Sequence, residues 1–184
     1  MPRHDAKQRL LHEVLQGNDA LSACPYLHLI LDAARDESIY PWLVEHQSRL
    51  EMAPLVGGSD AHDLAEVAPY LLRLSGSADL FDWYWDRGWG RAWGILIWST
   101  SSITTLRSHF ARLWRVHVEP DDVVFMRYYD PRVLPSLWQV LTAEQLTEVF
   151  RPVSMLWAEE DGGKVLGIYS PLTVRARRLV LTDV

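Results

Sequence analysis

The sequence has 184 residues, a length that fits one domain or one domain with a small appendage. Hydrophobic residues make up 48% and charged residues 23%, so the composition is that of a globular protein and not of a disordered chain. The net charge of −6 opposes binding to a phosphate backbone, and we therefore expect no nucleic-acid partner.

A single cysteine, Cys24, makes an internal disulfide impossible and favours a reducing compartment. The first residues lack the apolar segment of a signal peptide. No apolar run is long enough to cross a bilayer. These features predict a cytoplasmic protein with no membrane partner.

In the first half of the chain, apolar spacing predicts a helix over 4–16 that ends at Gly17. The almost continuously apolar run 26–31 predicts a strand covered on both faces. A helix over about 38–47, an extended piece and loop over 53–62, a strand over 67–74 and a helix over 79–87 are expected to follow.

In the second half, 94–98 is a third buried strand, and hydroxyl residues at 100–102 predict the cap of a helix that reaches about 115. A fourth strand is expected over 123–129. Asp130 and Pro131 then predict a helix start, and Thr142 and Gln145 fit a capping box. Strands over 153–158 and 165–169 flank an acidic, glycine-containing turn, which predicts a hairpin.

Strands alternate with helices through the middle of the chain, and this order favours an α/β layer architecture. We predict a mixed, partly parallel sheet flanked by helices, with an antiparallel hairpin near the C-terminus. The expected organisation is an N-terminal helix over 1–20, an α/β domain over 21–170 and a C-terminal tail over 171–184 whose structure the sequence leaves open.

No pattern in the sequence predicts a catalytic site, a cofactor or a metal centre. The glycine-rich segment 88–94 follows a helix and precedes a strand, which is the reverse of a phosphate-binding loop. The histidines form no metal-binding pair at helical spacing. Ser59 and His62 lie close together in the loop 57–63, but neighbours in sequence rarely form a working triad.

Nine tryptophans are the unusual feature of the composition. Most are expected in the core, but tryptophan is also enriched where proteins bind each other. Trp83, Trp85 and Trp89 crowd one helix and the turn after it. Residues 83 and 85 should point to different sides of that helix, so one of them is a candidate for exposure.

Five short blocks, in this order, resemble the effector adaptor or effector chaperone family of the bacterial type VI secretion system. The similarity covers roughly 27–155, and the blocks are 29–43, 63–71, 88–95, 106–110 and 127–134. The resemblance implies a non-enzymatic protein that binds a toxic effector in the cytoplasm and helps to load it onto the VgrG spike. It carries over no catalytic, metal or agreed binding residues.

The candidate partner-binding residues are Trp83, Trp85 and Trp89, with Arg127, Asp130 and Arg132 of the most distinctive block. For the last three, a structural role is the alternative, with Asp130 as a helix cap and an arginine clamping the loop. Two other functions stay open. One is an immunity-type protein that neutralises a toxin, and the other is a small hydrolase that uses the loop 57–63.

Overall fold

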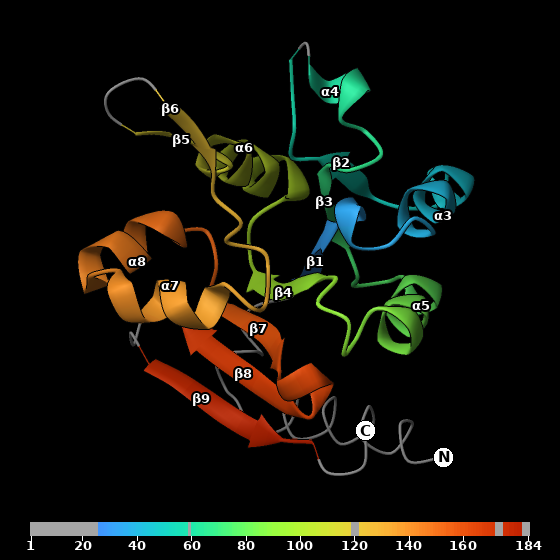
Figure 1. Cartoon of the computed structure of the whole chain (residues 1–184). Helices are drawn as coiled ribbons and strands as arrows, with labels where there is room; N and C mark the ends of the chain where they lie inside the picture. Colours follow the sequence, from blue (N-terminus) through green and yellow to red (C-terminus); the bar gives the residue numbers. More distant parts are fainter. Residues whose placement is uncertain (1–25, 59, 119–121, 172–174, 182–184) are drawn as a thin grey trace.

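The computed structural model describes residues 26–58, 60–118, 122–171 and 175–181 (Figure 1). The helix predicted within 1–20, Cys24 and Ser59 lie outside these residues.

A seven-stranded sheet with the order β2-β3-β1-β4-β7-β8-β9 forms the centre of the protein. Its strands are β1 (Tyr26–Asp32), β2 (Met52–Pro54), β3 (Pro69–Arg73), β4 (Gly94–Ser99), β7 (Met155–Glu160), β8 (Val165–Ser170) and β9 (Arg175–Val180). The apolar run that predicted a covered strand is β1, and it lies inside the sheet between β3 and β4. From Leu27 to Asp32 every β1 residue is buried.

The predicted partly parallel sheet is wrong, because every neighbouring pair in the main sheet is antiparallel. Helix α5 (Ala78–Arg87) connects β3 to β4, as a crossover helix connects parallel strands. However, β1 lies between these two strands and runs opposite to both. The alternation of strands and helices was therefore read correctly, but it does not reveal which strands become neighbours.

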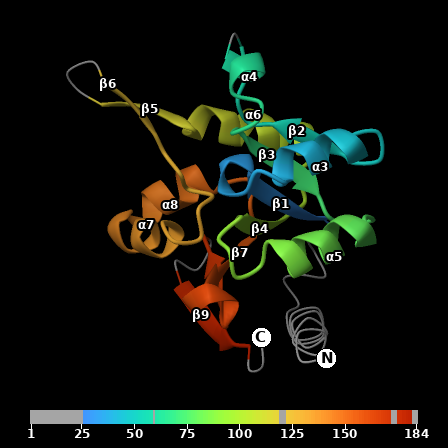
Figure 2. The same cartoon turned by 45° about the vertical axis from the view of Figure 1, so that its right-hand side comes forward.

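Helices cover both faces of the sheet (Figures 1 and 2). These helices are α3 (Ile39–His46), α5, α6 (Ile103–Leu113), α7 (Leu134–Val140) and α8 (Ala143–Val149). Trp42 of α3 stacks on Trp83 of α5 at 4.0 Å between ring centroids, so these helices share one face. On the other face, Trp138 of α7 lies 5.2 Å from the ring of Tyr169 on β8.

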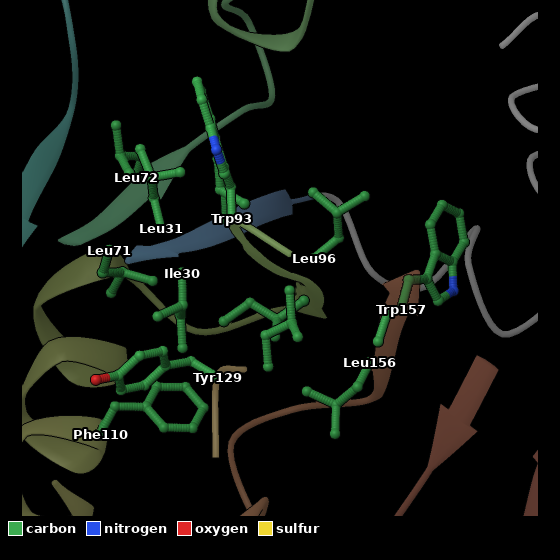
Figure 3. Close-up of a cluster of buried hydrophobic side chains, with 14 of the residues drawn as sticks. Ile30, Leu31, Leu71, Leu72, Trp93, Leu96, Phe110, Tyr129, Leu156 and Trp157 are labelled. Carbon is green, nitrogen blue, oxygen red and sulfur yellow. The ribbon is translucent and has the colours of Figure 1, made fainter. Parts of the chain in front are cut away.

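The core is built from residues that alternate along the central strands (Figure 3). Leu31 and Leu72 point to the same side as Trp93, whereas Ile30 and Leu71 point to the side of Phe110. All six side chains are at most 2% exposed. Both faces of the sheet are therefore packed, which explains why β1 reads as a continuous apolar run.

The segment after α6 differs from the prediction of one long strand over 123–129. Strands β5 (Arg115–Val118) and β6 (Asp122–Phe125) form a separate antiparallel pair, which projects from the body of the protein (Figures 1 and 2). Residues 126–133 then form a turn and loop, so α7 begins at Leu134 and not at Pro131. The N–H groups of Val133 and Leu134 both donate to the carbonyl of Asp130.

Two local predictions are confirmed in detail. The Thr142 side chain accepts a hydrogen bond from Gln145 N, and the Gln145 side chain accepts one from Thr142 N, which is the predicted capping box. β7 and β8 form the predicted antiparallel hairpin. Within the predicted tail, β9 adds a further strand beside β8.

Candidate partner-binding pocket

A pocket of about 500 Å³ lies where four segments that are distant in sequence meet. We call it the arginine pocket. Its lining residues are Arg35, Gly90, Arg91, Ala92, Pro131, Arg132, Pro135, Glu159, Glu160, Asp161 and Gly162. They come from the turn after β1, the turn before β4, the loop before α7 with the start of that helix, and the tip of the β7–β8 hairpin. The first three segments belong to the sequence blocks that carry the family resemblance.

The turn before β4 is held in place by Glu159 of β7. One carboxylate oxygen accepts the N–H of Gly90, and the other accepts the N–H of Ala92. Ala92 has a φ of 58°, a left-handed conformation that is unfavourable for a residue with a side chain. The two hydrogen bonds stabilise this strained turn. Burial raises the pKa of Glu159, although the two N–H groups oppose the shift.

The tip of the hairpin is tied to the same turn. The indole N–H of Trp89 donates to the carbonyl of Gly163 at 2.9 Å. A Cβ atom at Gly163 would lie 2.9 Å from the Cα of Gly90, and the φ of Gly163 is 88°. Only glycine allows this approach without strain. Two walls of the pocket are therefore fixed to each other.

Arg132 belongs to the third wall and is held by Asp130 behind it. The Asp130 carboxylate accepts bonds from Arg132 Nε at 2.9 Å and Nη2 at 2.6 Å, which is a bidentate pair. Asp130 is 2% exposed, whereas the Arg132 side chain is 55% exposed. Burial alone would raise the pKa of Asp130, but the hydrogen bonds from Arg132 outweigh it and leave the pKa below its ordinary value.

Arg35 forms the fourth wall, directly after β1. Asp32 begins this turn, since its Oδ1 accepts the N–H of Ala34 at 3.1 Å. Arg35 Nη2 donates to the carbonyl of Arg91 at 3.4 Å. Its Nε is buried and has no hydrogen-bond partner among the described residues. Burial raises the pKa of Asp32, and the charges of Arg127 and Arg35 partly offset this rise.

Exposure separates the six predicted partner-binding residues. Trp85 and Trp89 are each 1% exposed, so their rings belong to the core and offer no surface to a partner. Trp83 is half-buried, and its ring centroid lies 4.0 Å from that of Trp42 and 5.2 Å from that of Trp93. Neither Trp83 nor Trp85 is exposed, although Trp83 is the less buried of the two.

Two residues of the block over 127–132, Pro131 and Arg132, line the arginine pocket. Arg132 lines the pocket, and buried Asp130 supports it from behind. Arg127 is exposed and acts electrostatically on Asp32. The structural alternative for Arg132 holds, because it clamps the loop through Asp130 while most of its side chain stays exposed.

Arg35, Arg91 and Glu159 are site residues that the sequence analysis missed. Arg35 and Arg91 lie inside the recognised blocks, but no spacing connects them. Glu159 was interpreted as part of the acidic hairpin tip, whereas it is buried at the end of β7. The position of Glu159 directly after an apolar strand segment could have indicated that its side chain is buried.

The described part of the chain holds no group of three or more metal-ligating side chains. Among the same residues, no helix is long and apolar enough to cross a membrane.

The sequence model of a family described as "Domain of unknown function (DUF4123)" matches residues 27–148, which is more than half of the chain. No curated protein and no solved structure matches the chain.

Proposed function

Since the chain belongs to the DUF4123 family, which is associated with type VI secretion effector adaptors, we propose that it binds a toxic effector protein and helps to load it onto the VgrG spike. In this proposal the protein acts in the cytoplasm, through a binding surface and without catalysis. The family match over 27–148 is the observation that carries the proposal.

The arginine pocket supports a binding role within this proposal. Three of its four walls come from the segment that the family model matches. Three acidic side chains at the pocket are engaged: Glu159 holds a turn, Asp130 behind the pocket holds Arg132, and Glu160 accepts a bond from Arg178 at 2.7 Å. Groups engaged in this way shape a pocket and are poorly placed to transfer protons to a substrate.

Co-purification tests the proposal. The tagged protein is expressed together with a candidate effector and a VgrG protein from the same strain. Secretion of the effector is also measured in a strain from which the gene for this protein is deleted. We expect a complex of the protein with its effector, and loss of effector from the secreted fraction in the deletion strain. If both partners are well expressed and no complex forms, the proposal is wrong.

The same strains separate the two alternatives. An immunity-type protein would protect cells from the toxin and would not be needed for its export. A hydrolase that uses the loop 57–63 would lose activity on replacing Ser59 and His62 together by alanine, whereas an adaptor with both replacements should still support secretion.

A further inference from the structure

The arginine pocket has more hydrogen-bond donors than its own acidic residues use. Arg132 gives Nε and Nη2 to Asp130, which leaves its other N–H groups available. Arg35 keeps a buried Nε without a partner in the described part of the chain. The exposed guanidinium of Arg91 makes no ion pair with a described residue.

The acidic groups of the pocket have less capacity left. Both oxygens of Glu159 accept backbone N–H groups. Glu160 accepts bonds from the hydroxyl of Tyr169 at 2.5 Å and from Arg178 at 2.7 Å. Asp161 is exposed at the tip of the hairpin. Asp130 lies behind the pocket and is already paired with Arg132. The groups of the pocket that remain available to a ligand are therefore mainly the positively charged hydrogen-bond donors of the arginines.

Arg35 also faces negative charge within the protein, because its charge acts on the buried carboxyl groups of Asp32, Asp130 and Glu159. These groups keep the arginine in place but do not complete its hydrogen bonds. Burial raises the pKa of Asp32 and Glu159, so these two carboxylates take up a proton more readily than carboxylates in water do. Apart from the bond from Nη2 to Arg91, no hydrogen bond joins the Arg35 guanidinium to a described residue.

Two features indicate which carboxylate would fit. Chain termini are commonly bound by backbone N–H groups, but the N–H groups of Gly90 and Ala92 are occupied by Glu159. A guanidinium fork suits any planar carboxylate, so the occupied N–H groups are what favours a side chain over a chain terminus. Pro131 and Pro135 line the pocket beside the arginines and offer apolar contact to the methylene groups of such a side chain.

We propose that the arginine pocket binds a glutamate or aspartate side chain of a peptide segment of the partner protein, through Arg35, Arg91 and the free N–H groups of Arg132. This inference rests on the proposed adaptor function for the identity of the partner, but not for the chemistry of the pocket.

Peptide titration tests the chemistry directly. The probes are short peptides blocked at both ends that carry a central glutamate, glutamine or lysine, and a glutamine peptide with a free C-terminus. The complete chain is labelled with nitrogen-15, and the signals of Arg35 Nε–H and of the N–H groups over 90–92 are followed. We expect saturable shifts with the glutamate peptide and binding at least about tenfold weaker with the glutamine peptide.

Variants locate the binding to the arginines. Arg35→Gln and Arg91→Gln should each weaken binding of the glutamate peptide, and Arg112→Gln, an exposed arginine of α6, should not. Circular dichroism confirms that each variant is folded. The assignment is overturned if the glutamate peptide causes no shifts, or if the glutamine peptide binds as tightly as the glutamate peptide. It is also overturned if the lysine peptide or the free C-terminus is preferred, or if Arg35→Gln binds the glutamate peptide as the wild type does.

Co-purification with the effector separates this inference from the proposed function. If the wild-type chain binds the effector and the folded double variant of Arg35 and Arg91 binds it equally well, the pocket assignment is wrong and the adaptor function stands. If the glutamate peptide binds in the pocket and the wild-type chain captures no effector, the pocket assignment stands and the adaptor function fails.

Discussion

His28 makes the stability of the fold depend on pH. It lies on the central strand β1, opposite Arg73 of β3 and Ile97 of β4, and it is 1% exposed. Burial, together with the positive charge of Arg73, lowers the pKa of His28 to about 4, while Glu51 opposes the shift. A protonated imidazole at this position would be a buried cation with an unpartnered Nδ1 among the described residues.

The size of the effect follows from this pKa. The unfolded chain takes up the proton near the ordinary value of 6.5, whereas the folded chain does so only near 4. Between these pH values the unfolded state binds more protons than the folded state. The contribution of His28 to the free energy of unfolding is therefore fully present above pH 6.5 and is lost as the pH falls toward 4. At 1.36 kcal/mol per pKa unit, the loss amounts to about 3 kcal/mol by about pH 4.

The variant His28→Leu should remove this contribution. We propose to measure the free energy of unfolding in urea at several pH values between about 7 and 4, for the wild type and for the variant. The difference between the two should shift by about 3 kcal/mol in favour of the variant across this range. His62→Gln, at an exposed histidine, is the matched control and should follow the wild type.

Parallel curves for the wild type and His28→Leu would refute the reasoning. Such a result would mean that the folded protein accommodates the protonated imidazole, despite its burial inside the sheet. Equal effects of His28→Leu and His62→Gln would refute it as well.

Three further substitutions test contacts described above, each by urea unfolding against the wild type. Glu159→Gln should lower the free energy of unfolding by about 1–3 kcal/mol, because one backbone N–H loses its acceptor, whereas Glu148→Gln at an exposed ion pair should change it by at most about 1 kcal/mol. Gly163→Ala should cost about 2 kcal/mol or more, because its positive φ and the close turn leave no room for Cβ. Thr142→Ala should cost about 1 kcal/mol through the lost helix cap. A wild-type midpoint in any of these three variants would contradict the contact concerned.

Features that depend on neighbouring residues could be predicted from the sequence. The capping box at Thr142 and Gln145 requires only a four-residue pattern, and the β7–β8 hairpin requires two apolar runs around a short turn. The burial of β1 could also be predicted, because a strand packed on both faces must be apolar throughout.

The direction of the strands could not be predicted in the same way. Placement of β1 between β3 and β4 depends on pairing over a long sequence separation, for example Leu29 with Leu72 and with Leu96. No local pattern encodes that choice. The arginine pocket was hidden for the same reason, because Arg35, Arg91, Arg132 and Glu159 meet only after the sheet has formed.

The order of the sheet has a consequence for synthesis on the ribosome. After β1, the strands β4, β7, β8 and β9 each pair with the preceding member of this series, so the sheet grows at one edge in the order in which these strands are made. Until β7 emerges, the N–H groups of Gly90 and Ala92 lack the carboxylate of Glu159. The turn at Gly163 joins the pocket later still. The nascent chain thus completes most of its sheet before it completes the pocket, and a partner that requires all four walls can bind only a nearly finished chain.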